Sequence, residues 1–334
     1  MKLFRLLLCL IVLQFSFSLC SAQDAQPKKL RGEKASPQDT QKKAKKGPAI
    51  SVVETMEKAG ATIEVYKKTT DSKGKPVELK AFVFNPENHQ ASDRRSAIVF
   101  FFGGGWRSGT PTQFVPQCKY LAERGMVAIT VDYRVLSRQG TKPPACVSDG
   151  KSAVRWVREN AERLGVDPNR VAAGGGSAGG HVAACTGVIK TLDEPDENLE
   201  ISSKPNAMVL FNPALVLAPI DGAPQVSKNL AKKLNQLEQR IGADPKTISP
   251  AHNIAKNEPP TIIFHGEADK TVPYATAEVF DKLMNEAGNT CELVGYPGQG
   301  HGFFNANRKN GKYVETIKAL DRFLVSQGFL KSKN

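Results

Sequence analysis

From about residue 61, short apolar runs alternate along the chain with amphipathic segments. The run 95–102 ("RSAIVFFF") is continuously apolar after its second residue, as in a strand that is buried on both faces. The segment 147–165 instead repeats apolar residues at intervals of three and four, which favours a helix with one buried side. Strands that alternate with helices predict an α/β domain, with a mostly parallel central sheet and helices on both faces.

The predicted strands are 61–66, 78–84, 95–102, 126–133, 169–175, 206–213, 260–266 and 291–297, and the predicted helices are 111–125, 147–165, 178–189, 275–287 and 314–328. The first two strands are expected to form an antiparallel pair, and Trp156 is assigned to the core. In such sheets, functional residues gather in the loops beyond the carboxyl ends of the strands. Residues 214–256 show a less regular pattern and form an insertion with one amphipathic helix at 227–242. The insertion is either a small lid or a solvent-exposed loop.

The first 47 residues differ from the rest of the chain. Residues 1–22 combine a basic start, an apolar run and small residues before Ala22, which predicts a cleavable signal peptide and export. The run is short for a membrane span, which favours a cleaved signal peptide; the alternative is an uncleaved membrane anchor. Residues 23–47 contain no aromatic or β-branched residue except Thr40, which predicts a disordered basic tether. Residues 48–334 are predicted to form a single folded domain.

Charge and cysteine content exclude several classes of partner. The formal charge is +13, but residues 1–47 carry ten bases against three acids, which leaves +6 for the domain. The domain does not interleave basic and aromatic residues, so no nucleic-acid partner is expected. The tether could contact an anionic envelope or polysaccharide, or could simply be solvated. The four cysteines of the domain form no C-x-x-C pair, so no zinc site is expected. Export would permit disulfides between them, and buried free thiols are the alternative. These four are Cys118, Cys146, Cys185 and Cys291.

The stretch 171–181 ("VAAGGGSAGGH") fits two motifs with incompatible functions. From Gly174 it spells G-x-G-x-x-G, which binds dinucleotides when it follows the first strand of a βαβ unit. Here it follows the fifth predicted strand, and the acids at the required distance lie in the polar loop 193–200. Around Ser177 it spells G-x-S-x-G, the turn that lifts a nucleophilic serine above a sheet. The small neighbours of Ser177 favour the second interpretation.

Other residues that a nucleophilic serine needs are present in the required order. An oxyanion hole needs backbone N–H groups, which Ala178 and the glycine-rich segment 100–106 ("FFFGGGW") could supply. Of the five histidines, His301 follows the last strand between glycines and is the best candidate for the base. Asp269 follows strand 260–266 and is the preferred acid, with Glu267 as the alternative.

At these residues the chain resembles the α/β-hydrolase superfamily, and within it exported bacterial esterases of the hormone-sensitive-lipase and acetyl-xylan-esterase-like groups. The resemblance covers residues 60–330 and rests on "FFGGGWRSGT", "VDYR", "DPNRVAAGGGSAGGH", "HGEADKTVP" and "GHGF". It implies Ser177 as nucleophile, Asp269 as acid and His301 as base. It also implies that Gly104, Gly105 and Ala178 form the oxyanion hole, without a metal or organic cofactor.

Two residues depart from the pattern of that family. Phe102 stands where the glycine loop usually opens with His, and we expect apolar packing to hold the loop instead. Gly176 stands before the nucleophile, where the lipase-like group often has Asp, which points to the broader esterase group.

The sequence therefore predicts a secreted or periplasmic serine carboxylesterase that acts on short acyl esters, such as acetyl groups on a polysaccharide. Trp106, Tyr133 and His181 are candidate pocket residues. The substrate is expected to be a small-molecule or carbohydrate ester. The alternatives are a serine peptidase similar to the prolyl-oligopeptidase-like group, and a non-catalytic binding module on a hydrolase scaffold.

Overall fold

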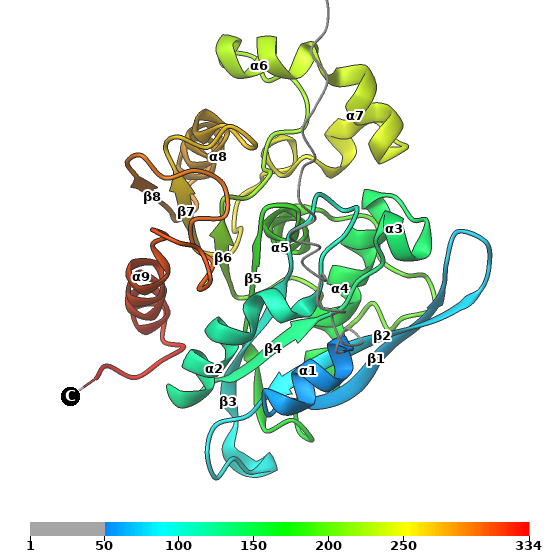
Figure 1. The fold of residues 1–334 in the computed structure, drawn as a ribbon, viewed down its shortest axis with the longest axis vertical. Helices are drawn as coiled ribbons and strands as arrows, with labels where there is room; N and C mark the ends of the chain where they lie inside the picture. Colours follow the sequence, from blue (N-terminus) through cyan, green and yellow to red (C-terminus); the bar gives the residue numbers. More distant parts are fainter. Residues whose placement is uncertain (1–50, 334) are drawn as a thin grey trace, which may run out of the picture. The chain divides into compact units, whose positions relative to one another are not determined.

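The centre of the fold is one eight-stranded sheet in the order β1-β2-β4-β3-β5-β6-β7-β8 (Figure 1). The computed structural model describes residues 51–333, so the predicted signal peptide (1–22) and tether (23–47) lie outside the described residues. The strands are β1 (Thr62–Thr70), β2 (Pro76–Phe84), β3 (Arg95–Phe101), β4 (Val127–Val131), β5 (Val166–Gly176), β6 (Ala207–Phe211), β7 (Thr261–Gly266) and β8 (Cys291–Tyr296).

The predicted pairing of the strands is confirmed. β1 and β2 form an antiparallel pair, β2 is antiparallel to β4, and every later neighbour in the sheet is parallel. The parallel strands carry apolar side chains on both faces; in β3, Ile98 and Phe100 pack in one core cluster while Val99 and Phe101 pack in the other. A continuous apolar run is therefore the pattern that this sheet requires.

Helices cover both faces of this sheet. One face packs against α1 (Val52–Lys58), α2 (Val115–Glu123) and α9 (Tyr313–Ser326), and the other against α4 (Pro143–Glu159), α5 (Ala178–Val188) and α8 (Tyr274–Glu286). A short helix, α3 (Leu136–Gln139), follows β4, and 3₁₀ turns occur at Ala91–Asp93 and Pro111–Phe114. The arrangement is the predicted α/β-hydrolase fold.

The helix predicted at 147–165 is displaced in the structure. α4 begins at Pro143 and ends at Glu159. A proline is favourable in the first turn, where its missing N–H would have no helical partner, so the helix starts earlier than its apolar pattern. Beyond Glu159 the chain makes turns, and Gly165 with φ of +59° leads into β5. Trp156 is only partly buried, with its ring edge-on to Tyr66, so its assignment to the inner core was too strong.

The insertion 214–256 contains two helices rather than one. α6 (Pro224–Ala231) and α7 (Leu234–Ile241) are separated by a turn at Lys232 and Lys233, where φ of Lys233 is −111° and ψ is 0°. 3₁₀ turns follow at Pro245–Ile248 and Pro250–His252. Apolar residues keep helical spacing across the break, so the sequence pattern does not reveal it. Both helices lie beyond one end of the sheet (Figure 1).

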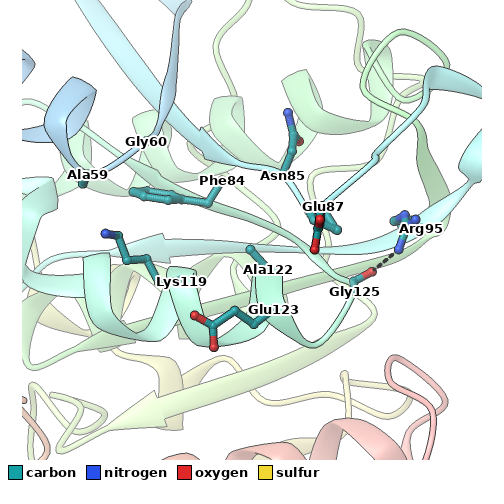
Figure 2. A pocket seen from close by; sticks show the side chains of 11 residues that line it. Ala59, Gly60, Phe84, Asn85, Glu87, Arg95, Lys119, Ala122, Glu123 and Gly125 are labelled. Atoms are coloured by element: carbon teal, nitrogen blue, oxygen red, sulfur yellow. Dashed lines mark hydrogen bonds between the residues drawn. The ribbon is translucent and has the colours of Figure 1, made fainter.

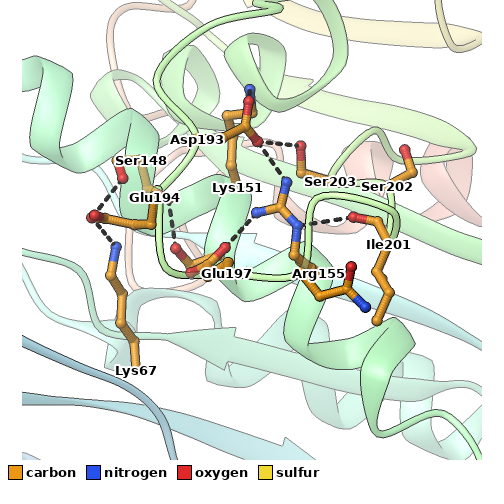
Figure 3. Close-up of polar contacts among 12 residues, drawn as sticks. Lys67, Ser148, Lys151, Arg155, Asp193, Glu194, Glu197, Ile201, Ser202 and Ser203 are labelled. Carbon is orange, nitrogen blue, oxygen red and sulfur yellow. Dashed lines mark hydrogen bonds and ion pairs between the residues drawn. The ribbon is translucent and has the colours of Figure 1, made fainter.

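Partly buried ion pairs attach the segment between α5 and β6 to α4 (Figure 3). Asp193 accepts hydrogen bonds from Lys151 and Arg155 at 2.5 Å each. Arg155 also pairs with Glu197, and Glu194 bonds Ser148 at 2.8 Å. Charges that are removed from water need such partners. These ion pairs therefore hold the segment between α5 and β6 in place, although it has too few apolar residues to be held by packing.

Each of the four cysteines of the described chain is a free thiol. Cys118, Cys146 and Cys185 are buried, and Cys291 is partly buried. No helix among residues 51–333 is both long and apolar enough to cross a membrane.

Candidate active site

Ser177 occupies a strained turn between β5 and α5. Its φ of 54° and ψ of −117° lie outside the regions that a serine normally adopts. A Cβ on Gly179 would lie 2.1 Å from the carbonyl oxygen of Phe101, and one on Gly175 would lie 2.3 Å from the carbonyl oxygen of Gly179. The two glycines of G-x-S-x-G are therefore needed for close backbone packing, which supports the elbow interpretation over the dinucleotide one.

The structure brings Ser177, His301 and Asp269 together. The side-chain oxygen Oγ of Ser177 lies 2.9 Å from Nε2 of His301, and Nδ1 of His301 lies 2.7 Å from Oδ2 of Asp269. Each residue follows a different strand of the sheet, namely β5, β8 and β7. The distances suit a nucleophile, a base and an orienting acid.

Asp269 is held as a carboxylate. Burial by itself would raise the pKa of Asp269, but hydrogen bonds from His265, His301 and the backbone N–H of Val272 outweigh burial and lower the pKa below its ordinary value. His265 lies in β7, as expected, and its Nε2 is 3.4 Å from Oδ2 of Asp269 and 2.9 Å from the carbonyl oxygen of Val272. Because a carbonyl only accepts, Nε2 of His265 carries the proton.

The alternative acid, Glu267, points elsewhere. Its side chain is exposed, and its carboxylate lies beside Gly295 of β8. Asp269 is thus the residue of the two that reaches His301.

The glycine loop (residues 102–110) follows β3 and adopts conformations that require glycine. Gly104 has φ of +134° and Gly105 has φ of +62°, and a Cβ on Gly104 would lie 2.0 Å from the carbonyl oxygen of Ser108. Within the described chain, the backbone N–H groups of Gly104, Gly105 and Ala178 donate to no protein acceptor. These groups are therefore free to bind an oxyanion, which is the role predicted for them.

Phe102 opens the glycine loop, and an apolar contact holds it, as the sequence predicted. Its ring stacks on Tyr133 with centroids 4.2 Å apart, and the hydroxyl of Tyr133 donates to the carbonyl oxygen of Phe102 at 2.6 Å. Tyr133 is fully buried, and this burial raises the pKa of its phenol well above the usual range. Tyr133 therefore supports the loop from beneath instead of forming a pocket wall, because a buried hydroxyl needs an acceptor and the loop carbonyl provides one.

Trp106 and His181, the other two candidate pocket residues, contact each other and the insertion. The indole Nε1–H of Trp106 donates to Nδ1 of His181 at 3.1 Å, and Nε2 of His181 lies 2.7 Å from the carbonyl oxygen of Ile248. The Arg240 guanidinium of α7 lies over the Trp106 indole, 5.2 Å from its centroid, and donates to the carbonyl oxygen of Gly105. The insertion is thus bonded directly to the glycine loop, as a lid would be.

Three polar residues near the site were not predicted: Gln113, Asn212 and Asn305. Asn212 follows β6 and accepts a 2.9 Å hydrogen bond from the N–H of Gly302, next to His301. In the structure Asn212 comes directly after β6, as Ser177 comes directly after β5, but the predicted strand 206–213 included Asn212 and so hid this signal. Gln113 and Asn305 carry no comparable sequence signal.

A depression between α1, β2 and α2 is not part of this site (Figure 2). It includes Arg95 at the start of β3, whose guanidinium donates to the carbonyl oxygen of Gly125 at 3.3 Å. Because β3 and β5 are parallel, this depression lies at the opposite end of the sheet from Ser177.

Comparisons with known proteins agree with this geometry. The family model BD-FAE matches residues 83–284. Esterase LipC of Mycobacterium tuberculosis is 30% identical over 220 residues, which are 62% of this chain and 52% of LipC. The acetylxylan esterase of Xylanibacter ruminicola is 30% identical over 229 residues, which are 66% of this chain and 42% of that protein. The chain thus spans about half the length of these curated relatives.

Solved structures of Thermogutta terrifontis esterase 2 match over nearly their whole length. The form phosphoramylated by tabun is 49% identical with a TM-score of 0.74, over 82% of this chain and 97% of that one. The butyrate-bound form is 48% identical with a TM-score of 0.77, over 86% of this chain and all of that one. The chain therefore belongs to the BD-FAE family and has the α/β-hydrolase fold, as these solved esterase structures do.

Proposed function

We propose that the protein is a secreted carboxylesterase that hydrolyses short-chain acyl esters through a covalent acyl-enzyme on Ser177. The observation that carries the proposal is the continuous hydrogen-bonded path from Ser177 through His301 to Asp269, at 2.9 and 2.7 Å. A serine hydroxyl is a weak nucleophile unless a base removes its proton during attack, and this path supplies the base.

Acylation begins when Oγ of Ser177 bonds to the ester carbonyl carbon while its proton moves to Nε2 of His301. The carbonyl oxygen becomes an oxyanion, which accepts hydrogen bonds from the free N–H groups of the glycine loop and Ala178. The Asp269 carboxylate stabilises the imidazolium through Nδ1. His301 then gives the proton to the leaving alkoxide as the carbon–oxygen bond of the ester breaks.

Deacylation repeats these steps with water as the nucleophile. His301 removes a proton from water as its oxygen attacks the acyl carbon, and returns a proton to Oγ of Ser177 as the acyl–serine bond breaks. The products are a carboxylic acid and the free enzyme.

A short acyl group is supported by the ligand of a relative. Thermogutta terrifontis esterase 2, which is nearly half identical to this chain, was solved with butyrate bound. Acetyl groups on a polysaccharide are the natural substrate that we propose, on the basis of the similarity to an acetylxylan esterase. The export motif of residues 1–22 is consistent with such an extracellular or periplasmic substrate.

Hydrolysis of p-nitrophenyl esters from acetate to octanoate tests the proposal. The protein is expected to favour acetate to butyrate, and Ser177→Ala or His301→Ala should reduce kcat by at least about 10³-fold. Release of acetate from acetylated xylan, measured beside the chromogenic esters, tests the polysaccharide substrate. A folded protein that is inert towards every ester would contradict the proposed activity.

Labelling with an organophosphate separates the alternatives. Paraoxon should modify Ser177 in one-to-one stoichiometry and abolish ester hydrolysis, whereas a non-catalytic binding module would not react. A serine peptidase would also be labelled, but it would cleave peptide amides faster than short acyl esters.

A further inference from the structure

Two side-chain amides connect the glycine loop to the loop that carries His301. The backbone N–H of Gly103 donates to Oε1 of Gln113 at 2.6 Å. Nε2 of Gln113 donates to Oδ1 of Asn305 at 2.9 Å, and Nδ2 of Asn305 donates to the carbonyl oxygen of Gly302 at 2.8 Å. Three consecutive hydrogen bonds thus link segments that are about two hundred residues apart in the sequence.

The direction of each hydrogen bond in this chain is determined by its ends. The N–H of Gly103 can only donate, so Gln113 must turn its oxygen towards it and its nitrogen towards Asn305. Asn305 must then present its oxygen to Gln113 and its nitrogen to the carbonyl of Gly302, which can only accept. Each of the three hydrogen bonds between Gly103 and Gly302 has a donor and an acceptor, so a flip of either amide would break two hydrogen bonds at once.

Both ends of this path of hydrogen bonds, Gly103 and Gly302, lie beside the reacting groups. Gly103 precedes Gly104, and a Cβ on Gly103 would lie 3.3 Å from Cβ of Ser177. Gly302 follows His301, and its own N–H is held by Asn212, which follows β6. Gln113 and Asn305 are each partly buried. A shift of either loop would therefore be transmitted through the two amides to the other loop.

We propose that Gln113 and Asn305 are positioning residues that couple the oxyanion-binding glycine loop to the loop of the catalytic base. Neither side chain bonds to Ser177, His301 or Asp269 in the structure, and they act through the backbone of Gly103 and Gly302. The oxyanion donors and the imidazole must be correctly placed at the same moment, because each contributes only in the transition state. The catalytic consequence of this coupling depends on the proposed function, whereas the coupling itself does not.

Hydrogen exchange measures the coupling without reference to activity. Asn305→Ala removes the bridge but leaves the hydrogen bond between Gln113 and Gly103, so amides of the glycine loop should exchange several-fold faster only if the bridge holds that loop. Gln113→Ala should in turn accelerate exchange around His301. Asn307→Ala is the matched control, because Asn307 is exposed and lies two residues from Asn305.

Kinetics measure the catalytic consequence. Gln113→Ala and Asn305→Ala should each lower kcat for p-nitrophenyl butyrate about tenfold, with KM within about twofold of wild type, because misplaced groups weaken transition-state contacts. The double variant should be hardly slower than either single variant, since both break one chain. Asn307→Ala should match wild type in every measurement.

Several results would overturn the coupling. They are a wild-type exchange rate in the glycine loop of Asn305→Ala, unchanged kcat in both single variants of an active enzyme, or effects that multiply in the double variant. A fall in kcat with an equal rise in KM and a large drop in Tm would also overturn it, because it would indicate general loosening. Coupled exchange in a wild-type protein that hydrolyses no ester would support the coupling and contradict the proposed function instead.

Discussion

The indole Nε1–H of Trp106 donates a hydrogen bond to Nδ1 of His181, which fixes His181 as the neutral tautomer protonated at Nε2. Nε2 then donates to the carbonyl oxygen of Ile248, so one buried imidazole joins the glycine loop, the helix after Ser177 and the insertion. Burial lowers the pKa of His181 to about 4, although the hydrogen bond to Ile248 acts in the opposite direction. A doubly protonated ring could not accept from Trp106, so acid should break this junction.

Stability should therefore fall between pH 6.5 and pH 4. The pKa of His181 is about 4 in the folded protein and near 6.5 in the unfolded chain, so the unfolded state binds more protons in this interval. The neutral imidazole of His181 makes its full contribution to the free energy of unfolding above pH 6.5. This contribution, about 3 kcal/mol in total, is lost as the pH falls through 4. Urea unfolding of wild type and His181→Asn should show a difference in unfolding free energy that shrinks with falling pH. A pH-independent difference would contradict this assignment.

Arg240 should matter more for activity than for stability. Its guanidinium covers the Trp106 indole and donates to the carbonyl of Gly105, although the residue itself is exposed. A cation–π contact at an exposed site contributes about 0.5–1 kcal/mol, so Arg240→Ala should change Tm by only a few degrees. Without it the glycine loop loses its contact with α7, and kcat/KM for p-nitrophenyl butyrate should fall about three- to tenfold.

The neighbouring exposed residue Gln239 provides the control for Arg240. Gln239→Ala should leave kcat/KM unchanged, because Gln239 lies on the same helix and is exposed. Equal activity of Arg240→Ala and wild type would show that the insertion does not support the glycine loop.

Gly176 is small because Phe304 packs against it. A Cβ at position 176 would lie 2.5 Å from the ring of Phe304, which belongs to the loop of His301 and is itself fully buried. Gly176→Ala should thus destabilise the protein by about 1–3 kcal/mol, since overpacking forces the ring and its loop to move. Phe304→Leu in the same chain should restore part of the loss. Thermal unfolding of the two single variants and the double variant checks this, and purely additive losses would show that the clash is not the cause.

Much of the fold follows from local patterns, and the departures have physical causes. β3 and Ser177 were predictable because a continuous apolar run and a cluster of small residues are local signals. The supporting role of Tyr133 was not predictable, because it depends on the carbonyl of Phe102 that only the folded chain brings near. The break at Lys233 escaped prediction for a similar reason, since a helical apolar spacing continues through it.

Asp269 and Glu267 differ by two positions, and substitution of each should separate their roles. Asp269→Asn replaces the oxygen that accepts from Nδ1 of His301 with an amide, which favours the wrong imidazole tautomer, so kcat should fall by about 10⁴. Glu267→Gln changes an exposed carboxylate that lies beside Gly295 and should leave kcat within twofold of wild type. Steady-state hydrolysis of p-nitrophenyl acetate, with circular dichroism to confirm folding, measures both. A large loss in Glu267→Gln with Asp269→Asn still active would reverse the assignment of the acid, because only the residue bonded to His301 can stabilise the imidazolium that forms as Ser177 attacks.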